Sequence, residues 1–226
     1  MSKTAKKRGS PASRRLTREH WVATALDILI KYGVERVKVL PLAGKLGVTR
    51  GSFYWHFNNR KDLLDSLLEF WDRKNTRGIV EQAAHGGSSI IDSVLSVFEI
   101  WTNEDKFDPQ LDFAVREWAR RSTRVRAIVE QADAERVEAL KRMFLRAGTP
   151  DAEAFIRARV LYYMQIGYFA PGVRESLDRR IGYVDEYLRV FTGVEPRREA
   201  VNNFTRRALR GEFSAPSKRR RRGGKS

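Results

Sequence analysis

The chain has 226 residues and a formal net charge of +16, with no cysteine and three histidines. This length suits one domain or two small ones, and the cysteine count excludes a disulfide framework and thiolate metal sites. Residues 160–173 form the longest run without a charge, which is shorter than the ~20 residues of a membrane span. The basic N-terminus is not followed by the apolar segment that a secretory signal requires. We therefore expect a cytoplasmic protein with no membrane partner, metal or cofactor.

The positive charge lies at the two ends of the chain. Residues 1–62 carry 14 lysines and arginines against 4 acidic residues, and residues 196–226 carry 11 against 2. Residues 63–195 carry 19 against 22. A near-neutral body with a basic head and tail indicates a localised contact with a polyanion. General solubility would explain a net charge but not this segregation.

The first 77 residues or so predict a disordered arm followed by four helices. Residues 1–15 hold six basic and no acidic residues, so we expect a disordered basic arm. Apolar residues at helical spacing predict a helix over Arg18–Tyr32, which Gly33 ends. Further helices are expected at Val39–Leu46, at Thr49–Phe57 and from Asn59 to near Gly78.

Residues 42–64 have the pattern of a helix, a tight turn and a second helix. Gly47 can adopt the left-handed backbone that ends one helix, and Thr49 is a suitable N-cap for the next. The second helix is polar at its start and aromatic at its end. Phe53 and Phe57, four residues apart, are expected to anchor it to a core. This arrangement is typical of a helix that enters a DNA groove.

The run GVTRGSFYWHFNNRKDLLDSLL resembles the signature of the tetracycline-repressor-like (TetR) transcriptional regulators. The resemblance covers roughly residues 16–77 well. It implies a three-helix helix-turn-helix DNA-binding domain over residues 16–62, with the helix-turn-helix at about 39–58. It also implies a homodimer on the nucleoid, in most cases a repressor, that leaves a palindromic DNA operator when a small-molecule effector binds.

The resemblance also implies roles for individual residues in DNA binding. Arg50 is the candidate for a base edge, Tyr54 and His56 are expected to hold the DNA backbone, and Arg60 matches the basic phosphate ligand of the family. The full expected set is Arg14, Arg15, Thr17, Lys45, Thr49, Arg50, Gly51, Ser52, Tyr54, Trp55, His56, Arg60 and Lys61.

The helix at Val39–Leu46 departs from the family pattern. Lys38 occupies the position of the usual threonine or serine cap, and Leu40 stands where some relatives carry a polar residue that reaches a base. Gly44 weakens the helix interior by ~1 kcal/mol. We therefore expect few base contacts from this helix.

The rest of the chain predicts an all-α helical bundle for ligand binding and dimerisation over residues 63–193. Helices are expected at about 89–104, 109–121, 123–146, 151–170 and 174–192, separated by proline, glycine and polar breaks. By analogy with the family, the aromatic residues of this body would line an effector cavity. The candidates are Phe98, Trp101, Phe113, Trp118, Phe144, Tyr163, Gln165 and Tyr168.

Two stretches of the body suggest a dimer interface. Residues 160–173 are uncharged on all sides, and apolar residues from Leu177 onwards follow a four-three spacing typical of a helix seam. The expected interface consists of Leu161, Tyr162, Ile166, Phe169, Leu177, Ile181, Val184, Leu188 and Phe191. The alternative is that both helices bury these residues within one subunit.

Residues 194–226 predict a basic, disordered tail that begins with a short amphipathic helix and that either adds DNA affinity or has no role. No nucleophile–base pair, phosphate loop or histidine cluster indicates an enzyme. A nucleoid-type protein that coats DNA through its basic ends, without an effector, remains the alternative function. It would bind random and operator DNA equally.

Overall fold

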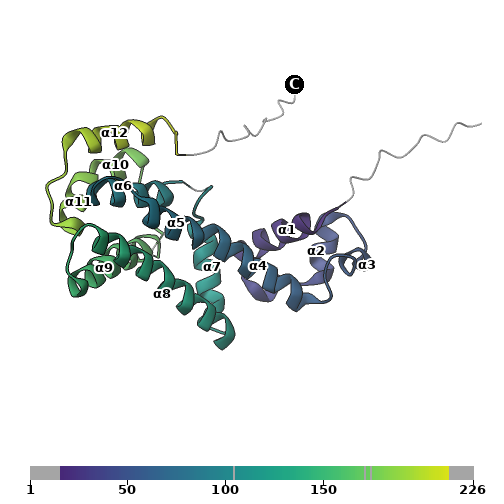
Figure 1. The fold of residues 1–226 in the computed structure, drawn as a ribbon. Coiled ribbons are helices and arrows are strands. Elements are labelled where there is room, and N and C mark those ends of the chain that lie inside the picture. Colours follow the sequence, from purple (N-terminus) through teal and green to yellow (C-terminus); the bar gives the residue numbers. More distant parts are fainter. Residues whose placement is uncertain (1–15, 104, 171, 174, 214–226) are drawn as a thin grey trace, which may run out of the picture. The chain divides into compact units, whose positions relative to one another are not determined.

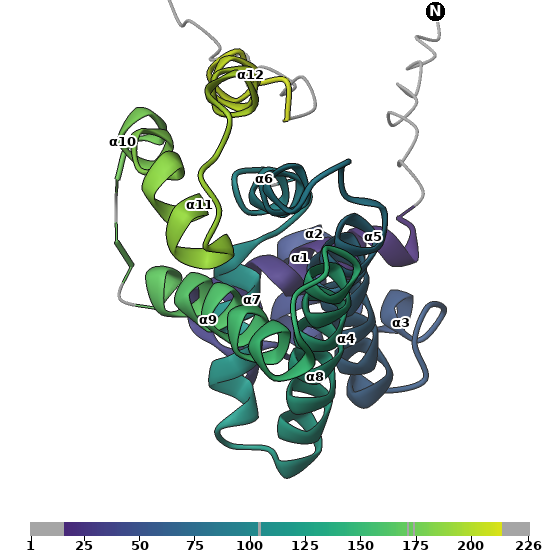
Figure 2. The same ribbon diagram turned by 60° about the vertical axis from the view of Figure 1, so that its left-hand side comes forward.

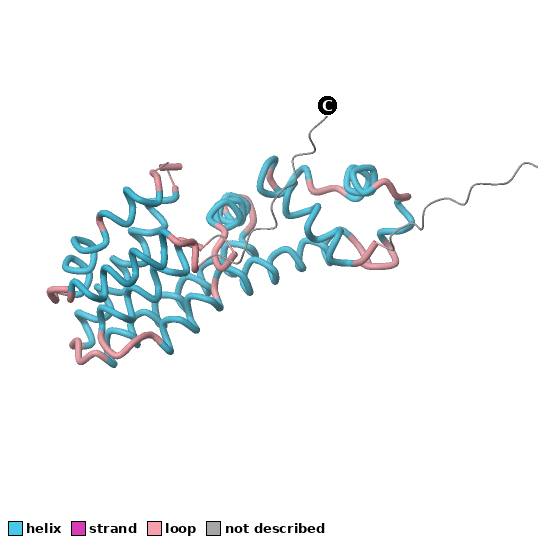
Figure 3. Tube along the Cα trace, turned by 90° about the horizontal axis from the view of Figure 1, so that it is seen from above, coloured by secondary structure: helices cyan, strands magenta, loops and turns pink. Residues whose placement is uncertain are grey.

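The computed structural model describes residues 16–103, 105–170, 172–173 and 175–213. Every regular element in these ranges is a helix (Figure 3), so the predicted all-α fold is confirmed. The chain divides into two compact units between Leu67 and Leu68. No helix among the described residues combines the length and apolar content needed to cross a bilayer.

The first unit is a small helical domain around an aromatic core. Its elements are α1 (Arg18–Tyr32), the 3₁₀ turn η1 (Val34–Arg36), α2 (Val39–Leu46), α3 (Arg50–Phe53) and the start of α4 (Arg60–Asn75) (Figure 1). Trp21 meets Phe53 edge-on at 5.3 Å between ring centroids, and Phe53 stacks on Phe57 at 5.2 Å. All three rings are buried. The predicted anchoring of the second helix by Phe53 and Phe57 is confirmed.

Gly47 forms the turn between α2 and α3. Its φ of 68° is in the left-handed region, where a side chain would be strained. The N–H of Val48 reaches back to the Ala43 carbonyl at 3.0 Å, which satisfies a carbonyl that the end of α2 leaves free. The turn that the sequence predicts at Gly47 is therefore present.

The second helix of this motif is shorter than predicted. We expected it to continue to Phe57, but α3 ends at Phe53 and residues 54–56 form turns. The N–H groups of Tyr54 and His56 bond to carbonyls three residues back, at 3.2 and 2.9 Å, instead of four. Phe53 and Phe57 nevertheless both lie in the core.

The second unit is a helical bundle. After the end of α4 it contains α5 (Arg77–His85), α6 (Ile90–Trp101), α7 (Pro109–Ala119), α8 (Thr123–Arg146), α9 (Asp151–Phe169), α10 (Leu177–Gly182), α11 (Val184–Thr192) and α12 (Arg198–Leu209). The most extensive helix pairing is between α8 and α9, and α5 packs on both α6 and α8 (Figure 2). Leu140, Phe144, Ala158 and Leu161 lie in its core.

A break at Thr76 replaces the predicted continuous helix to Gly78. Asn75 is buried, and its side chain accepts from the Asp108 N–H at 3.1 Å and donates to the Asp108 carbonyl at 2.9 Å. These two bonds fix the end of α4 to the start of α7. The chain resumes as α5 at Arg77.

Four charged side chains form an ion-pair network inside the second unit. Arg136 of α8 has no exposed surface and lies between Asp112 and Asp133, at 3.4 and 3.5 Å. Arg116 contacts the same two carboxylates, both at 2.7 Å. Burial acts to raise the pKa of Asp112, but the neighbouring Arg136 and Arg116 hold this pKa below its usual value. The network has two positive and two negative groups, so it is neutral.

Neutral side chains complete the bonding of this network. The Tyr162 hydroxyl donates to Asp133 at 2.6 Å and accepts from Arg136 at 2.8 Å. Arg136 also donates to the Thr76 hydroxyl at 2.8 Å, and the Trp71 indole N–H donates to Asp112 at 2.8 Å. The network therefore joins α4, α7, α8 and α9.

The helix predicted over residues 174–192 is two helices. Tyr183, with φ −97° and ψ −2°, separates α10 from α11, and Gly182 precedes it. At the far end, Gly193 adopts a φ of 68°, and the Arg157 guanidinium lies where a side chain on Gly193 would be. Arg157 donates to the Phe191 carbonyl at 2.6 Å, which joins α9 to the end of α11.

The folded body extends past the predicted boundary at residue 193. The short helix that we expected at the start of the tail is α12, which packs on α6 and α10 (Figures 1 and 2). Phe204 and Phe213 are buried against each other, and Arg207 donates to Glu99 of α6 at 2.6 Å. Apolar burial thus makes residues 198–213 part of the body. The rest of the predicted tail, 214–226, and the predicted arm, 1–15, lie outside the described residues.

Candidate DNA interface and ligand pocket

The short helix α3 and the turn after it present a polar and aromatic surface. Arg50, Gly51 and Tyr54 are exposed, and Trp55 is 83% exposed. Thr49 is exposed, whereas Ser52 and His56 are half-buried. The same segment buries Phe53 and Phe57 on its other side. The residues expected to contact DNA and those expected to pack are therefore on opposite sides of one segment.

Arg50 and Tyr54 hold each other on this surface. An Arg50 Nη2 group donates to the Tyr54 hydroxyl at 3.0 Å, and the guanidinium lies 5.7 Å from the Tyr54 ring centroid. The remaining N–H donors of the guanidinium are available to a base edge or a phosphate. The contact restricts the long side chain of Arg50 before any partner arrives.

Other predicted contacts surround this surface. Thr17 is exposed, and its backbone N–H donates to His20 Nδ1 at 3.1 Å. Lys45 pairs with Asp27 at 3.2 Å, and Lys31 pairs with the same carboxylate at 2.6 Å. Asp27 therefore offsets part of the charge that Lys45 would offer to a phosphate. Arg14 and Arg15 lie outside the described residues.

Arg60, the expected phosphate ligand, is also held by bonds within its own domain. Its Nε donates to the Val37 carbonyl at 2.6 Å and an Nη2 group donates to the Val34 carbonyl at 2.8 Å. These carbonyls belong to η1 and the residue after it, so Arg60 fixes the start of α4 against η1. Two of its donors bind backbone oxygens, which gives Arg60 a structural role that sequence resemblance did not reveal.

Lys61 is the exposed cation at the start of α4. Its side chain is 71% exposed and forms an i,i+4 pair with Asp65 at 2.9 Å. Asn59 caps the helix by accepting from the Asp62 N–H at 3.0 Å, and Asp62 accepts from the Asn58 N–H at 2.9 Å. Lys61 is therefore the more exposed of the two cations at this helix end, although Asp65 offsets part of its charge.

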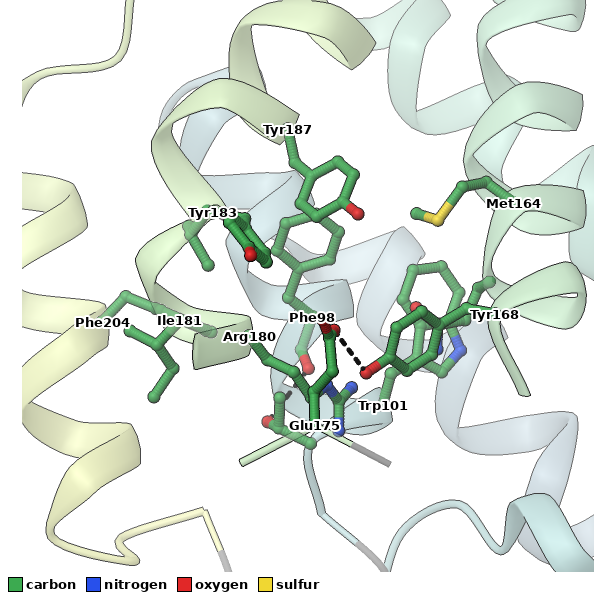
Figure 4. Close-up of a pocket in the computed structure, with 13 residues that line it drawn as sticks. Phe98, Trp101, Met164, Tyr168, Glu175, Arg180, Ile181, Tyr183, Tyr187 and Phe204 are labelled. Atoms are coloured by element: carbon green, nitrogen blue, oxygen red, sulfur yellow. Dashed lines mark hydrogen bonds between the residues drawn. The ribbon is translucent and has the colours of Figure 1, made fainter. Parts of the chain in front are cut away.

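The second unit contains a pocket between α6, α9, α10 and α11 (Figure 4). Four of the eight predicted ligand residues line it: Phe98, Trp101, Gln165 and Tyr168. The sequence did not single out seven other lining residues: Thr102, Met164, Glu175, Arg180, Tyr183, Tyr187 and Phe204. Those on α10 and α11 were missed because this stretch was read as a dimer helix. The free volume of about 50 Å³ is enough for a few water molecules.

The other four predicted ligand residues lie elsewhere. Phe144 is fully buried in the core and Trp118 is buried on α7, whereas Phe113 and Tyr163 are exposed. None of these four lines the pocket. Aromatic composition alone does not separate core, surface and cavity residues, which is why only half of the predicted set lines this pocket.

Most of the predicted dimer residues are buried within one chain. Leu161, Tyr162, Ile181, Val184, Leu188 and Phe191 belong to the core of the second unit, and Ile166 and Phe169 pack against that core. Leu177 is the exception and is partly exposed. A second copy cannot reach the buried residues, because their own subunit already covers them. For these residues the alternative, burial within one subunit, is the correct reading.

The same two helices expose a different apolar face. Ile156, Val160 and Tyr163 of α9 are between 42% and 55% exposed, and Val190 of α11 is 71% exposed. Ile156, Val160 and Val190 line one shallow groove with Arg157, which joins the two helices. Exposed large apolar side chains that gather in one place mark interaction sites. The sequence indicated these helices but not this face.

The first unit resembles bacterial regulators in sequence. Residues 22–67 match the family profile described as bacterial regulatory proteins, tetR family. The chain is 44% identical over 55 residues to the tetracycline repressor protein class C of Escherichia coli, a match that covers 24% of this chain and 25% of the repressor. It is 36% identical over 61 residues to the uncharacterized HTH-type transcriptional regulator TtgW of Pseudomonas putida, covering 27% and 46%. The matches thus span less than half the length of these relatives.

Solved structures resemble the chain over most of its length. AmtR of Mycobacterium smegmatis has a TM-score of 0.59 at 16% identity, covering 91% of this chain and 98% of that protein. A transcriptional regulator from Rhodococcus sp. Rha1 has a TM-score of 0.52 at 17% identity, covering 89% and 100%. At these identities the likeness concerns the fold: an N-terminal helix-turn-helix domain followed by a helical C-terminal domain.

Proposed function

We propose that the chain is a homodimeric, sequence-specific transcriptional repressor of the tetR family of bacterial regulatory proteins, whose profile its residues 22–67 match. In this proposal it binds a palindromic operator and leaves it when a small molecule occupies the second unit. The observation that carries the proposal is the segment from Arg50 to Phe57. It is fixed to a core by two phenylalanines and exposes arginine, tyrosine and tryptophan on its other side.

Each exposed residue of this segment has a role in the proposal. Arg50 reads a base edge, because its planar fork can bond to guanine at two atoms. Tyr54 and Trp55 contact the sugar–phosphate backbone and fix the register of the segment. Lys45 and Lys61 add phosphate contacts that do not depend on sequence. Gly51, which has no side chain, allows a close approach to the groove.

We propose that the exposed face of α9 and α11 joins two copies of the chain. The same patch on both subunits would pair about a two-fold axis, as most homodimers do. Ile156, Val160 and Val190 supply the apolar centre of this contact, and Arg157 and Glu153 lie beside it. To bind a palindrome, such a dimer has to present its two Arg50–Phe57 segments about 34–36 Å apart, which is the spacing of successive major grooves.

The dimer face is tested by placing a charge at its centre. Val160→Glu should shift the protein from dimer to monomer in sedimentation equilibrium at micromolar concentration, because a buried unpaired carboxylate opposes association. Leu209→Glu, which changes an exposed leucine on α12, is the matched control and should stay dimeric. A monomeric wild-type protein at this concentration would contradict the proposal.

The DNA-binding role is tested by selecting bound fragments from a random duplex pool. We expect a palindromic winner that binds at least ~10³-fold more tightly than random DNA at physiological salt. Arg50→Ala should reduce this preference at one position of each half-site, at a cost of about 1–3 kcal/mol. Equal losses on selected and scrambled DNA would contradict the role of Arg50. Equal affinity of the wild type for both would instead favour a DNA-coating protein.

A further inference from the structure

We propose that the pocket between α6, α9, α10 and α11 binds a planar aromatic acid, meaning a flat ring system that carries a carboxylate. This inference rests on the proposed function, because it identifies the chemical class of the effector. The walls of the pocket, its charge and one buried amide each point to this class.

The walls of the pocket are aromatic on opposite sides. In Figure 4, Tyr183 and Tyr187 face Met164 and Tyr168 across the pocket, with Phe98 behind them. Tyr183 and Tyr187 meet edge-on at 6.4 Å between ring centroids. Aromatic walls favour a flat ring, which can stack on one side chain and meet the edge of another. Such a ring is larger than the free volume, so its entry requires the partly exposed Tyr183 and the half-buried Tyr168 to turn away from their hydroxyl partners, Arg179 and Glu175.

The charges at the pocket favour an anion. Glu175 is already compensated, since it accepts from the Tyr168 hydroxyl at 3.0 Å and pairs with Arg179 at 3.3 Å. Arg180 lies over the Tyr168 ring at 5.2 Å and over the Phe169 ring at 5.9 Å. No acidic side chain in the described ranges pairs with Arg180. A cationic ligand would meet a guanidinium that already occupies the aromatic faces, whereas a carboxylate would find a partner.

Gln165 supplies a hydrogen-bond donor that the protein itself does not use. The residue lines the pocket and is 6% exposed, and its Nε2 group has no hydrogen-bond partner among the described residues. Leaving a buried amide donor unpaired is unfavourable. A carboxylate or ring carbonyl that enters the pocket would provide the missing acceptor. Arg180 and Gln165 thus both donate, and an acid is the ligand class that accepts from both.

The inference is tested by isothermal titration of the full-length protein with three matched probes. Naphthalene-2-carboxylate is aromatic and anionic, naphthalen-2-ylmethanamine is aromatic and cationic, and decahydronaphthalene-2-carboxylate is anionic but saturated. We expect the aromatic acid to bind, the amine not to bind, and the saturated acid to bind about 2- to 10-fold more weakly. Binding of the amine at least as tight as that of the aromatic acid would overturn the inference.

Two variants assign the binding to the named donors. Arg180→Gln should lower the binding affinity for the aromatic acid about 10- to 100-fold, as expected for loss of a charged hydrogen bond. Gln165→Leu, which keeps the size of the side chain, should weaken it about 3- to 10-fold while raising the melting temperature of the free protein. Arg142→Gln, on the exposed side of α8, is the control. Unchanged affinity in both pocket variants would overturn the assignment.

The same samples separate failure of this inference from failure of the proposed function. Each is also titrated with the palindrome selected from the random pool. A protein that binds the palindrome but none of the acids retains the proposed function and loses the ligand class. A protein that binds the aromatic acid but prefers no DNA sequence loses the proposed function. If the aromatic acid binds but does not lower the affinity of the protein for the palindrome, it is not the effector.

Discussion

Replacing Arg136 by methionine removes one of the two cations from the buried ion-pair network. Arg136 is fully buried and lies within ion-pair distance of both Asp112 and Asp133. Methionine fills a similar space but leaves the two carboxylates with Arg116 alone. The variant therefore buries one negative charge without a partner, and it removes the donors to Thr76 and Tyr162.

We expect Arg136→Met to lower the free energy of unfolding by about 3–5 kcal/mol, the usual cost of breaking a buried pair from one side. Loss of the contact between the guanidinium and the Trp71 ring, at 4.9 Å, adds to this cost. A domain has only about 5–15 kcal/mol of stability, so the effect would be large. Combining Arg136→Met with Asp112→Leu leaves one cation, Arg116, paired with one anion, Asp133. The double variant should therefore recover much of the lost unfolding free energy.

Urea unfolding followed by circular dichroism measures these free energies. The slope of the unfolding free energy against urea should stay unchanged if the compactness of the two states is the same. Arg142→Met breaks an ion pair with Glu138 on the exposed side of the same helix and should leave the midpoint close to that of the wild type. A loss below about 1 kcal/mol for Arg136→Met, or no recovery in the double variant, would refute the reasoning.

The remaining predictions concern the start of α4 and the response to acid. Arg60→Ala should lower unfolding stability by about 2–4 kcal/mol, because two charge-assisted bonds to carbonyls are lost, with little change in the salt dependence of DNA binding. Lys61→Ala should leave the urea midpoint unchanged but reduce the slope of log affinity against log salt by about 1; the reverse pattern would restore Arg60 as the phosphate ligand. The pKa of Asp112 lies below its unfolded value, so its contribution to stability is complete above about pH 4 and is lost as pH falls through the native pKa. Asp112→Asn should therefore lower the melting temperature at pH 7 and make it less sensitive to acid between pH 5 and 2. A melting temperature that falls as steeply over this pH range as that of the wild type would contradict this.

Local patterns predicted the elements of the first unit well. The helices at Arg18–Tyr32 and Val39–Leu46 and the turn at Gly47 occur where they were expected. These features depend on residues that are close in sequence: apolar spacing, a glycine at a helix end, and two phenylalanines four apart. The role of Arg60 could not be predicted in the same way, since its partners are the carbonyls of Val34 and Val37 in another element.

The dimer and pocket residues show where sequence periodicity stops being informative. In α9, Leu161 and Tyr162 are buried while Val160 and Tyr163 beside them are exposed. A helix that is apolar on all sides does not reveal which side its own subunit covers. Likewise, Phe204 in a basic segment belongs to the core only because α12 folds back onto α6. These outcomes depend on tertiary packing, which local patterns do not contain.

The uneven burial of the five tryptophans gives the protein a built-in optical probe. Trp21, Trp71, Trp101 and Trp118 are shielded from water, whereas Trp55 stands almost free beside Arg50 and Tyr54. Iodide should quench the emission of Trp55 before that of the others, and the red edge of the spectrum should belong to this single indole. Binding of duplex to the recognition segment could thus be followed in unlabelled protein, through the shielding of one residue.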